Sequence, residues 1–251
     1  MAALRLFAHR GLSARAPENT IAALEVAARA GAEWVEIDAD ISADGVVFLC
    51  HDATLERTTN GSGPIADKTW AELARLDAGA WKSPRFAGER LPLLSEVVEW
   101  ASRRGVGLNV ELKSPLGGAR QARRLVDAAC EILGDACCGV LVSSFNHLML
   151  ARAGRKTSHP LACLFEAGEL REDWRTRVEL VGARAIHPAW EDLTPHRLER
   201  MRAFGYDVNV WTVNCAEKAR ELARWGASGI FCDDVEAMAA SLGVTKDALL
   251  D

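Results

Sequence analysis

The first half of the chain carries ionisable residues at spacings that could build a reactive site. Glu36 and Asp38 are separated by one residue, as are Glu111 and Lys113. Side chains two positions apart on a strand point to the same face, so each pair would project together. Asp40 shares the face of Glu36 but lies further along, and we expect it to be a solvated loop carboxylate outside the site. Burying an unpaired carboxylate costs several kcal/mol, and a hard divalent cation is its natural partner.

Three of these acidic residues are the predicted metal ligands. Carboxylates of Glu36, Asp38 and Glu111, completed by water and substrate oxygens, suit Mg²⁺ or Ca²⁺ far better than zinc. The alternative is that the carboxylates form salt bridges with Arg10 and Lys113 and hold no metal. The residue types leave both readings open at this point.

Two histidines stand beside charged residues, in His9-Arg10 and His51-Asp52. An imidazole titrates near neutral pH, so a pair of them can act as general base and general acid. Taken singly, each is better explained as a structural histidine that bonds a backbone carbonyl. Together with the carboxylates, Arg10 and Lys113, the pair predicts proton transfer on an anionic substrate, of which a phosphate ester is the commonest kind.

Short apolar runs alternate with helical patterns along the chain and would position these side chains. Residues 19–30 predict a helix that Asn19 could cap, and Thr194-Pro195 is a similar helix start. The eight predicted strands cover residues 4–9, 34–41, 107–113, 138–144, 160–165, 183–188, 206–212 and 229–233.

Eight strand-helix units in a chain of 251 residues predict an α/β protein, a single (β/α)₈ TIM barrel domain spanning residues 1–251. Side chains at the carboxyl ends of the strands would then form the site. The alternative is a doubly wound open sheet. No Gly-x-Gly-x-x-Gly follows a strand, which weakens the dinucleotide-binding form of that alternative.

A stretch after the second predicted strand, at about residues 53–92, breaks the alternation. It contains the turn cluster Thr59-Asn60-Gly61-Ser62-Gly63-Pro64 and a short helix whose Thr69 and Glu72 fit a capping box. Because loops that follow strands build the active face of a barrel, we expect this insertion there. It is too short and too polar for an independent core.

Composition narrows the class of protein. With 30 basic and 35 acidic residues the net charge is −5, which argues against a nucleic-acid partner. No apolar run approaches the roughly 20 residues of a membrane span, and no export signal is visible. The seven cysteines form no C-x-x-C pair and are expected to be small buried hydrophobes in a reducing cytoplasm.

At this point the motifs closely resemble those of the glycerophosphodiester phosphodiesterases, in order along almost the whole chain. Three further stretches, Asp77-Ala78-Gly79-x-Trp81, Asp173-Trp174-Arg175 and Ile230-Phe231-Cys232-Asp233, resemble the bacterial cytoplasmic branch most. The motifs that carry the resemblance are His9-Arg10-Gly11, Pro17-Glu18-Asn19-Thr20, Glu36-x-Asp38, Asp44-Gly45, His51-Asp52, Leu55-x-Arg57-Thr58-Thr59 with Gly61, Leu91-Pro92-x-Leu94, Glu111-x-Lys113, Ser144-Phe145 and Trp211-Thr212-Val213-Asn214.

The resemblance implies a (β/α)₈ barrel with a small insertion after the second strand and a role for each candidate residue. Trp211 is similar in position to an aromatic on the glycerol side of the family's pocket, or is simply a packed barrel residue. Where many members carry Thr-Asp-x-Pro after the last strand, this chain has Cys232-Asp233-Asp234-Val235, and we expect that difference to affect only the local turn. The implied roles are catalysis for His9 and His51, metal binding for Glu36, Asp38 and Glu111, and phosphate contact for Arg10 and Lys113.

The activity that the resemblance implies is metal-dependent hydrolysis of small-molecule glycerophosphodiesters to glycerol 3-phosphate and an alcohol, with head groups such as choline or ethanolamine. Water or the substrate's own glycerol hydroxyl could attack, and either histidine could be the base. Two alternatives are a phospholipase-type phosphodiesterase acting on lyso-lipids or phosphoinositides, and a non-catalytic barrel that binds a phosphorylated metabolite. The mixed charges of the insertion do not form a membrane-binding pattern, which disfavours the first.

Overall fold

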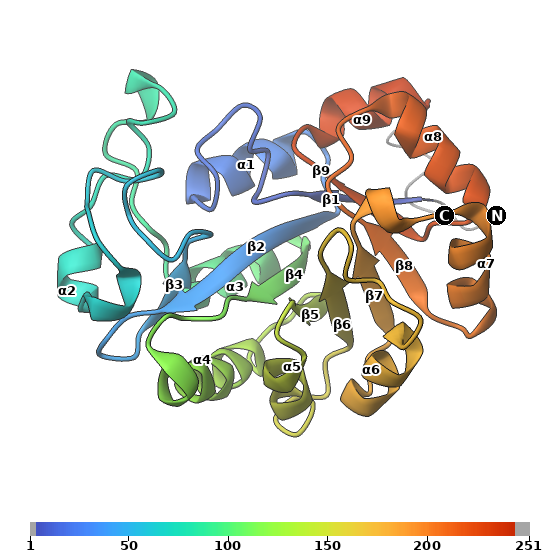
Figure 1. Cartoon of the computed structure of the whole chain (residues 1–251). Coiled ribbons are helices and arrows are strands. Elements are labelled where there is room, and N and C mark those ends of the chain that lie inside the picture. Colours follow the sequence, from blue (N-terminus) through green and yellow to red (C-terminus); the bar gives the residue numbers. More distant parts are fainter. Residues whose placement is uncertain (1–3, 244–251) are drawn as a thin grey trace.

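Eight parallel strands close into a ring in the computed structural model, which describes residues 4–243. Neighbouring strands pair around the ring, and pairing of the first with the second closes it, so the predicted (β/α)₈ barrel is confirmed (Figure 1). Each ring strand overlaps one of the eight predicted runs. The ring strands are β1 (Arg5–Ala8), β2 (Trp34–Ile41), β4 (Gly107–Leu112), β5 (Val140–Ser144), β6 (Leu161–Phe165), β7 (Ala185–Pro188), β8 (Asp207–Val210) and β9 (Gly229–Cys232).

Helices between the strands surround the ring. Thr194 caps the helix that begins with Pro195, as predicted. The cap of the first helix is Thr20, whose side chain accepts from the Ala23 amide, and not Asn19 as predicted. The surrounding helices are α1 (Ile21–Arg29), α3 (Leu94–Arg104), α4 (Gly118–Leu133), α5 (His147–Ala153), α6 (Trp174–Val181), α7 (Pro195–Ala203), α8 (Ala216–Trp225) and α9 (Val235–Leu242).

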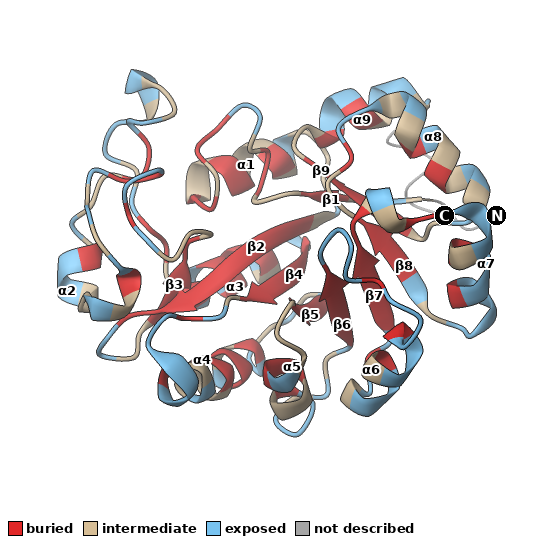
Figure 2. Ribbon diagram, viewed as in Figure 1, coloured by how far each residue is buried: buried red, intermediate tan, exposed pale blue. Residues whose placement is uncertain are grey.

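The core lies between the ring and the helices. Figure 2 shows the strands buried, while the helices expose their outer faces. In α4, for example, Leu125, Ala129 and Leu133 recur every four residues and are all buried, which is the stripe that an amphipathic helix packs inward. Burial of these apolar stripes holds the strands in place and so fixes the positions of the side chains at their ends.

The amino-terminal end of the barrel interior is filled by an aromatic ring. Trp34 contacts a small apolar cluster of Leu141, Ala162 and Ala185. A Cβ at Gly107 would lie 2.5 Å from the Trp34 ring, so only glycine leaves room for it. The barrel is therefore closed at this end.

An additional strand outside the ring precedes the insertion. β3 (Val47–Leu49) pairs antiparallel with β2 and was not among the predicted strands. It leads into two short 3₁₀ helices, at Ile65–Asp67 and Pro84–Phe86, and into α2 (Trp70–Leu73), where the Glu72 carboxylate accepts from the Thr69 amide, as the capping box requires. Figure 1 shows α2 and its loops to one side of the ring.

The insertion shares a small core with β3, separate from the core of the barrel. Its separate cluster of buried residues includes Phe48, Leu55, Ile65 and Leu73. Phe48 comes from β3, so pairing with β2 supplies apolar surface that the loop composition does not reveal. Lys82 donates to the backbone oxygen of Ser13, which brings the insertion against the loop that follows β1.

Two other expectations concern helix hydropathy and cysteines. Among residues 4–243, no helix is both long and apolar enough to cross a membrane. All seven cysteines are free thiols. Four are buried as expected, Cys138 is half-buried, and Cys137 and Cys215 are exposed, so the expectation of buried cysteines is wrong for those two.

Candidate active site

A cavity of about 320 Å³ opens among the carboxyl ends of the ring strands. Seven of the eight residues predicted from the sequence line it, and the eighth, Asp38, lies 3.3 Å from the Lys113 Nζ. Both histidines border this one cavity, although one follows β1 and the other follows β3. The seven lining residues are His9, Arg10, Glu36, His51, Glu111, Lys113 and Trp211.

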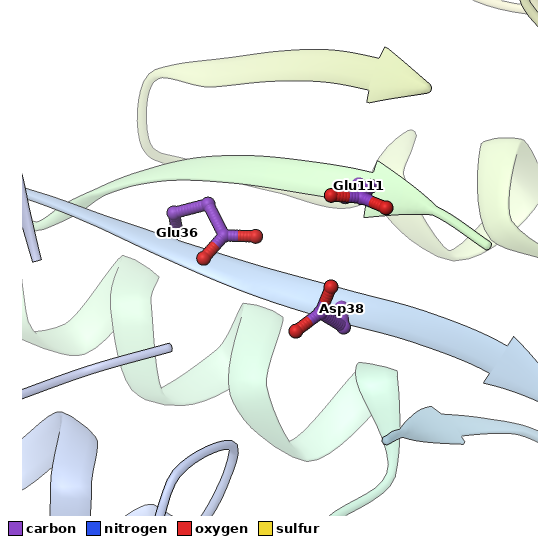
Figure 3. A group of neighbouring side chains, drawn as sticks. All are labelled: Glu36, Asp38 and Glu111. Carbon is purple, nitrogen blue, oxygen red and sulfur yellow. The ribbon is translucent and has the colours of Figure 1, made fainter. Parts of the chain in front are cut away.

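Three carboxylates converge beside the cavity. Glu36 and Asp38 project from β2, and Glu111 projects from β4, where it lies beside Asp38 in the strand register (Figure 3). One oxygen from each lies within 4.8 Å of one from each of the others. All three are less than a tenth exposed. Three buried carboxylates at this spacing match the oxygen-ligand set that Mg²⁺ and Ca²⁺ prefer.

Burial and mutual repulsion oppose the ionisation of this group of carboxylates. Burial, followed by repulsion from Asp38 and Glu111, raises the pKa of Glu36 well above its usual range. Burial likewise raises the pKa of Glu111. Burial opposes ionisation of Asp38 too, but Lys113 and Arg10 outweigh it and hold its pKa well below the usual range. Because two nearby cations stabilise only one of three carboxylates fully, the donor set fits a bound divalent ion.

Asp38 is held in place by a residue that the sequence reading assigned elsewhere. The Asn19 side chain donates to Asp38 Oδ2 at 2.8 Å and accepts from the Asp38 amide at 3.0 Å. Asn19 adopts a left-handed backbone with φ of 56°, a conformation that asparagine tolerates better than most residues. Its place directly before a helix suggested a cap, so only the fold brings out its role as a support for Asp38.

His9 has a carboxylate partner from the last strand. Its Nδ1 lies 2.7 Å from Asp233 Oδ1. Burial opposes ionisation of Asp233, but its contacts with His9, together with the hydrogen bonds from Asn214 and Ser13, outweigh that effect and lower the pKa of Asp233. An ionised carboxylate can only accept, so Nδ1 carries the hydrogen and Nε2 is left for proton transfer. Asp233 is the aspartate that Cys232-Asp233-Asp234-Val235 shares with the family's Thr-Asp-x-Pro, so this turn contributes a site residue that the sequence analysis did not predict.

His51 has the same arrangement with its neighbour. Its Nδ1 lies 2.6 Å from Asp52 Oδ1, and Arg57 bonds both Asp52 and Glu18. The hydrogen bond from Arg57 lowers the pKa of Asp52 to about 2, so this carboxylate is also ionised. Burial lowers the pKa of His51 itself. Both histidines are thus oriented by a carboxylate on Nδ1.

Asp40 is buried, contrary to the prediction from the sequence. The sequence predicted a solvated loop carboxylate, but Asp40 is 3% exposed within β2 and accepts from the Ile41 amide at 2.7 Å. Burial raises its pKa to about 7. Because β2 runs to Ile41, one residue beyond Asp40, that carboxylate stays inside the structure. It is not part of the three-carboxylate group.

The opposite wall of the cavity is aromatic. The Trp211 indole donates to the His187 backbone oxygen at 2.9 Å, and its ring meets Phe145 edge-to-face at 5.4 Å. Asn109 also lines the cavity and was not predicted as a site residue; its side chain donates to Ser143 Oγ at 3.0 Å. Its position two residues before Glu111, on the same strand face, is the signal that could have identified it.

Comparison with known proteins places these features in one family. Residues 9–237 match the sequence profile of the Glycerophosphoryl diester phosphodiesterase family. A glycerophosphodiester phosphodiesterase of Caldanaerobacter subterraneus subsp. tengcongensis is 35% identical over 93% of this chain and 95% of its own. One from Bacillus subtilis is 30% identical over 89% of this chain and 81% of its own.

Solved structures of phosphodiesterases resemble this one over nearly the whole chain. An Oleispira antarctica phosphodiesterase, in complex with the product sn-glycerol-3-phosphate, superposes with a TM-score of 0.90 at 33% identity, over 95% of this chain and 96% of its own. A Thermotoga maritima glycerophosphodiester phosphodiesterase gives 0.78 at 27% identity, over 96% and 99%. With the family match extending from the first histidine past the last strand of the barrel, the chain belongs to the glycerophosphoryl diester phosphodiesterase family.

Proposed function

We propose that this protein hydrolyses glycerophosphodiesters to glycerol 3-phosphate and an alcohol, with His9 and His51 transferring the protons. The observation that carries the proposal is that both histidines line the cavity beside the three-carboxylate group. In each, a carboxylate bonds Nδ1, which fixes the tautomer and directs Nε2 to proton transfer. One histidine removes the proton of the attacking oxygen while the other protonates the leaving alkoxide.

Glu36, Asp38 and Glu111 would hold the divalent cation, Mg²⁺ or Ca²⁺. When bound there, such an ion supplies positive charge that polarises the phosphate oxygens. The fit rests on the donor set: three buried carboxylates, two of which have a raised pKa. A cation would stabilise their ionised forms.

Arg10 and Lys113 would neutralise the charge that grows on the phosphate. Lys113 lies 2.7 Å from Glu111, and Arg10 lies 3.3 Å from Asp38, so both cations border the carboxylates that hold the ion. Positive groups fixed before the substrate arrives stabilise the transition state at little cost in reorganisation. Trp211, on the opposite wall, would pack against the glycerol carbons.

The Oleispira antarctica phosphodiesterase supports the substrate class, because its structure contains the product sn-glycerol-3-phosphate. We therefore propose a small-molecule glycerophosphodiester substrate. We also propose a cytoplasmic location, which the seven free thiols support, since reducing compartments keep cysteines unpaired.

A coupled assay for glycerol 3-phosphate release, run over a panel of glycerophosphodiesters with Mg²⁺ and with Ca²⁺, tests the proposal. We expect His9→Ala and His51→Ala each to lower kcat by about 10²- to 10⁴-fold. Metal binding, followed by titration calorimetry, should stay unchanged in both variants. Wild-type turnover of none of the substrates, or full activity of either variant, would contradict the proposal. Metabolite binding without turnover would instead favour a non-catalytic barrel.

A further inference from the structure

A second cavity adjoins the catalytic one. It has a volume of about 540 Å³ and lies beside β6 and the helices α5 and α6. Phe145, directly after β5, and Glu166, directly after β6, line both cavities and so form their common wall. The two cavities therefore meet at these two residues.

Charge is distributed unevenly along this path. The catalytic cavity contains Arg10 and Lys113, the groups that fit a phosphate. At the common wall the charged residue is Glu166, which is exposed. Nearby Glu172 pairs with arginines of α7, whereas no ion pair forms at Glu166 within residues 4–243. Glu166 thus offers an available carboxylate at the boundary between the two cavities.

The other groups at this boundary suit a cation as well. Phe145 presents an aromatic ring that is only half-buried, and a ring face attracts an ammonium group. Arg177, the cation of the side cavity, lies 4.7 Å from the centre of the Phe165 ring and donates to the backbone oxygen of Glu169. Its contacts are thus with Phe165 and Glu169, and it forms no ion pair with Glu166 in the described part of the chain.

We infer that the leaving alcohol of the substrate crosses the wall formed by Phe145 and Glu166 and extends into the side cavity. Glu166 then selects diesters whose leaving alcohol carries an ammonium group. The phosphate remains with Arg10 and Lys113, so the two opposite charges of such a substrate meet opposite charges of the protein. This inference rests on the proposed function and adds a specificity residue to it.

The test compares two substrates in wild type and Glu166→Gln. Glycerophosphocholine has a cationic leaving alcohol, and glycerophosphoglycerol has a neutral one. We expect wild type to prefer glycerophosphocholine in kcat/KM by about three- to tenfold, the range for a partly exposed charge contact with an aromatic neighbour. In Glu166→Gln the preference should disappear through KM, while kcat/KM for glycerophosphoglycerol stays within twofold of wild type.

Glu172→Gln is the matched control, because it removes the same charge from an exposed glutamate that does not line either cavity. It should keep the wild-type preference. Raising the salt concentration should weaken the preference in wild type and leave Glu166→Gln unaffected, since ions screen exposed charges.

Three outcomes would overturn the inference: no preference in wild type, the same preference in Glu166→Gln, or loss of the preference in Glu172→Gln. A large wild-type preference for lysophosphatidylcholine over glycerophosphocholine would also overturn it, because Leu148 and Leu180 of the side cavity would then receive an acyl chain. In each of these cases, turnover of glycerophosphoglycerol by wild type would still support the proposed function. Only the absence of turnover on every diester would contradict both the proposed function and the inferred role of Glu166.

Discussion

The two sides of the barrel mouth carry different chemistry. β1, β2 and β4 carry ionisable side chains at their ends, and nearly every one of these has a bonded partner, such as Asp233 on His9 or Asn19 on Asp38. β5, β6 and β8 are followed by Phe145, Glu166 and Trp211, which have few polar contacts. The charged side needs fixed orientations because proton transfer depends on geometry. The aromatic side instead offers apolar surface of a fixed shape, which contributes to substrate binding.

Removal of the metal should have the largest effect, because it acts at the centre of the charged side. We expect EDTA to reduce glycerol 3-phosphate release below detection and excess Mg²⁺ or Ca²⁺ to restore it. In Glu36→Gln, restoration should require a much higher ion concentration, because one of the three proposed ligands has lost its charge. Activity that is indifferent to the chelator would show that the carboxylates act without a metal.

Asp233→Asn should have the next largest effect. The amide cannot hold His9 in one tautomer as an ionised carboxylate does, so we expect kcat to fall by about 10- to 100-fold with KM changed less than threefold. Asp234→Asn is the control, since Asp234 caps α9 and pairs with Arg15 without touching His9. Equal losses in the two variants would mean that the turn, and not the histidine, is affected.

Trp211→Ala, a change on the aromatic side, should affect KM and not kcat, the reverse of Asp233→Asn. Losing its packing surface should raise KM about tenfold and leave kcat within threefold. Trp211→Phe should lie near wild type, because it retains an aromatic ring against Phe145. A fall in kcat without a change in KM would remove the distinction between the two sides.

His187→Gln should have the smallest effect on turnover, since His187 is fully buried below Trp211. Its effect should appear instead in the pH dependence of the free energy of unfolding. Burial lowers its pKa to about 3 from the ordinary 6.5. The unfolded chain therefore binds a proton that the folded protein does not between these pH values. The free energy of unfolding should fall by about 1.4 kcal/mol per pH unit from this group as pH drops below 6.5. Urea unfolding at pH 7 and pH 5 measures this fall, which should be smaller in His187→Gln than in wild type. An equal fall in the free energy of unfolding of the two proteins would contradict the lowered pKa of His187.

Much of the ring could be predicted from the sequence. Buried parallel strands are continuous apolar runs, and glycine ends many of the helices before them, as Gly105 does for α3 and Gly226 for α8. The additional strand β3 was missed because three residues carry too short a pattern. The small core of the insertion was missed for the same reason, since Phe48 of that strand is part of it.

The candidate site could be predicted where its residues alternate along a single strand. The alternation of Glu36 and Asp38 places both on one face, and the structure brings them to Glu111. Contacts between distant segments leave no local pattern, so the bond between His9 and Asp233, 224 positions apart, was not predicted. Asp40 lies within the predicted strand 34–41, but it was misassigned because it pairs with Phe48 of β3, a strand that was not predicted.

The indole that fills the amino-terminal end of the barrel determines the route of every ligand. With Trp34 packed against Gly107 at the amino-terminal end, the catalytic cavity opens at the carboxyl ends of the strands. Substrate enters and both products depart by that same path. The freed alcohol, which we infer extends into the side cavity, and glycerol 3-phosphate, which we propose is held by Arg10 and Lys113, leave the barrel by the same end.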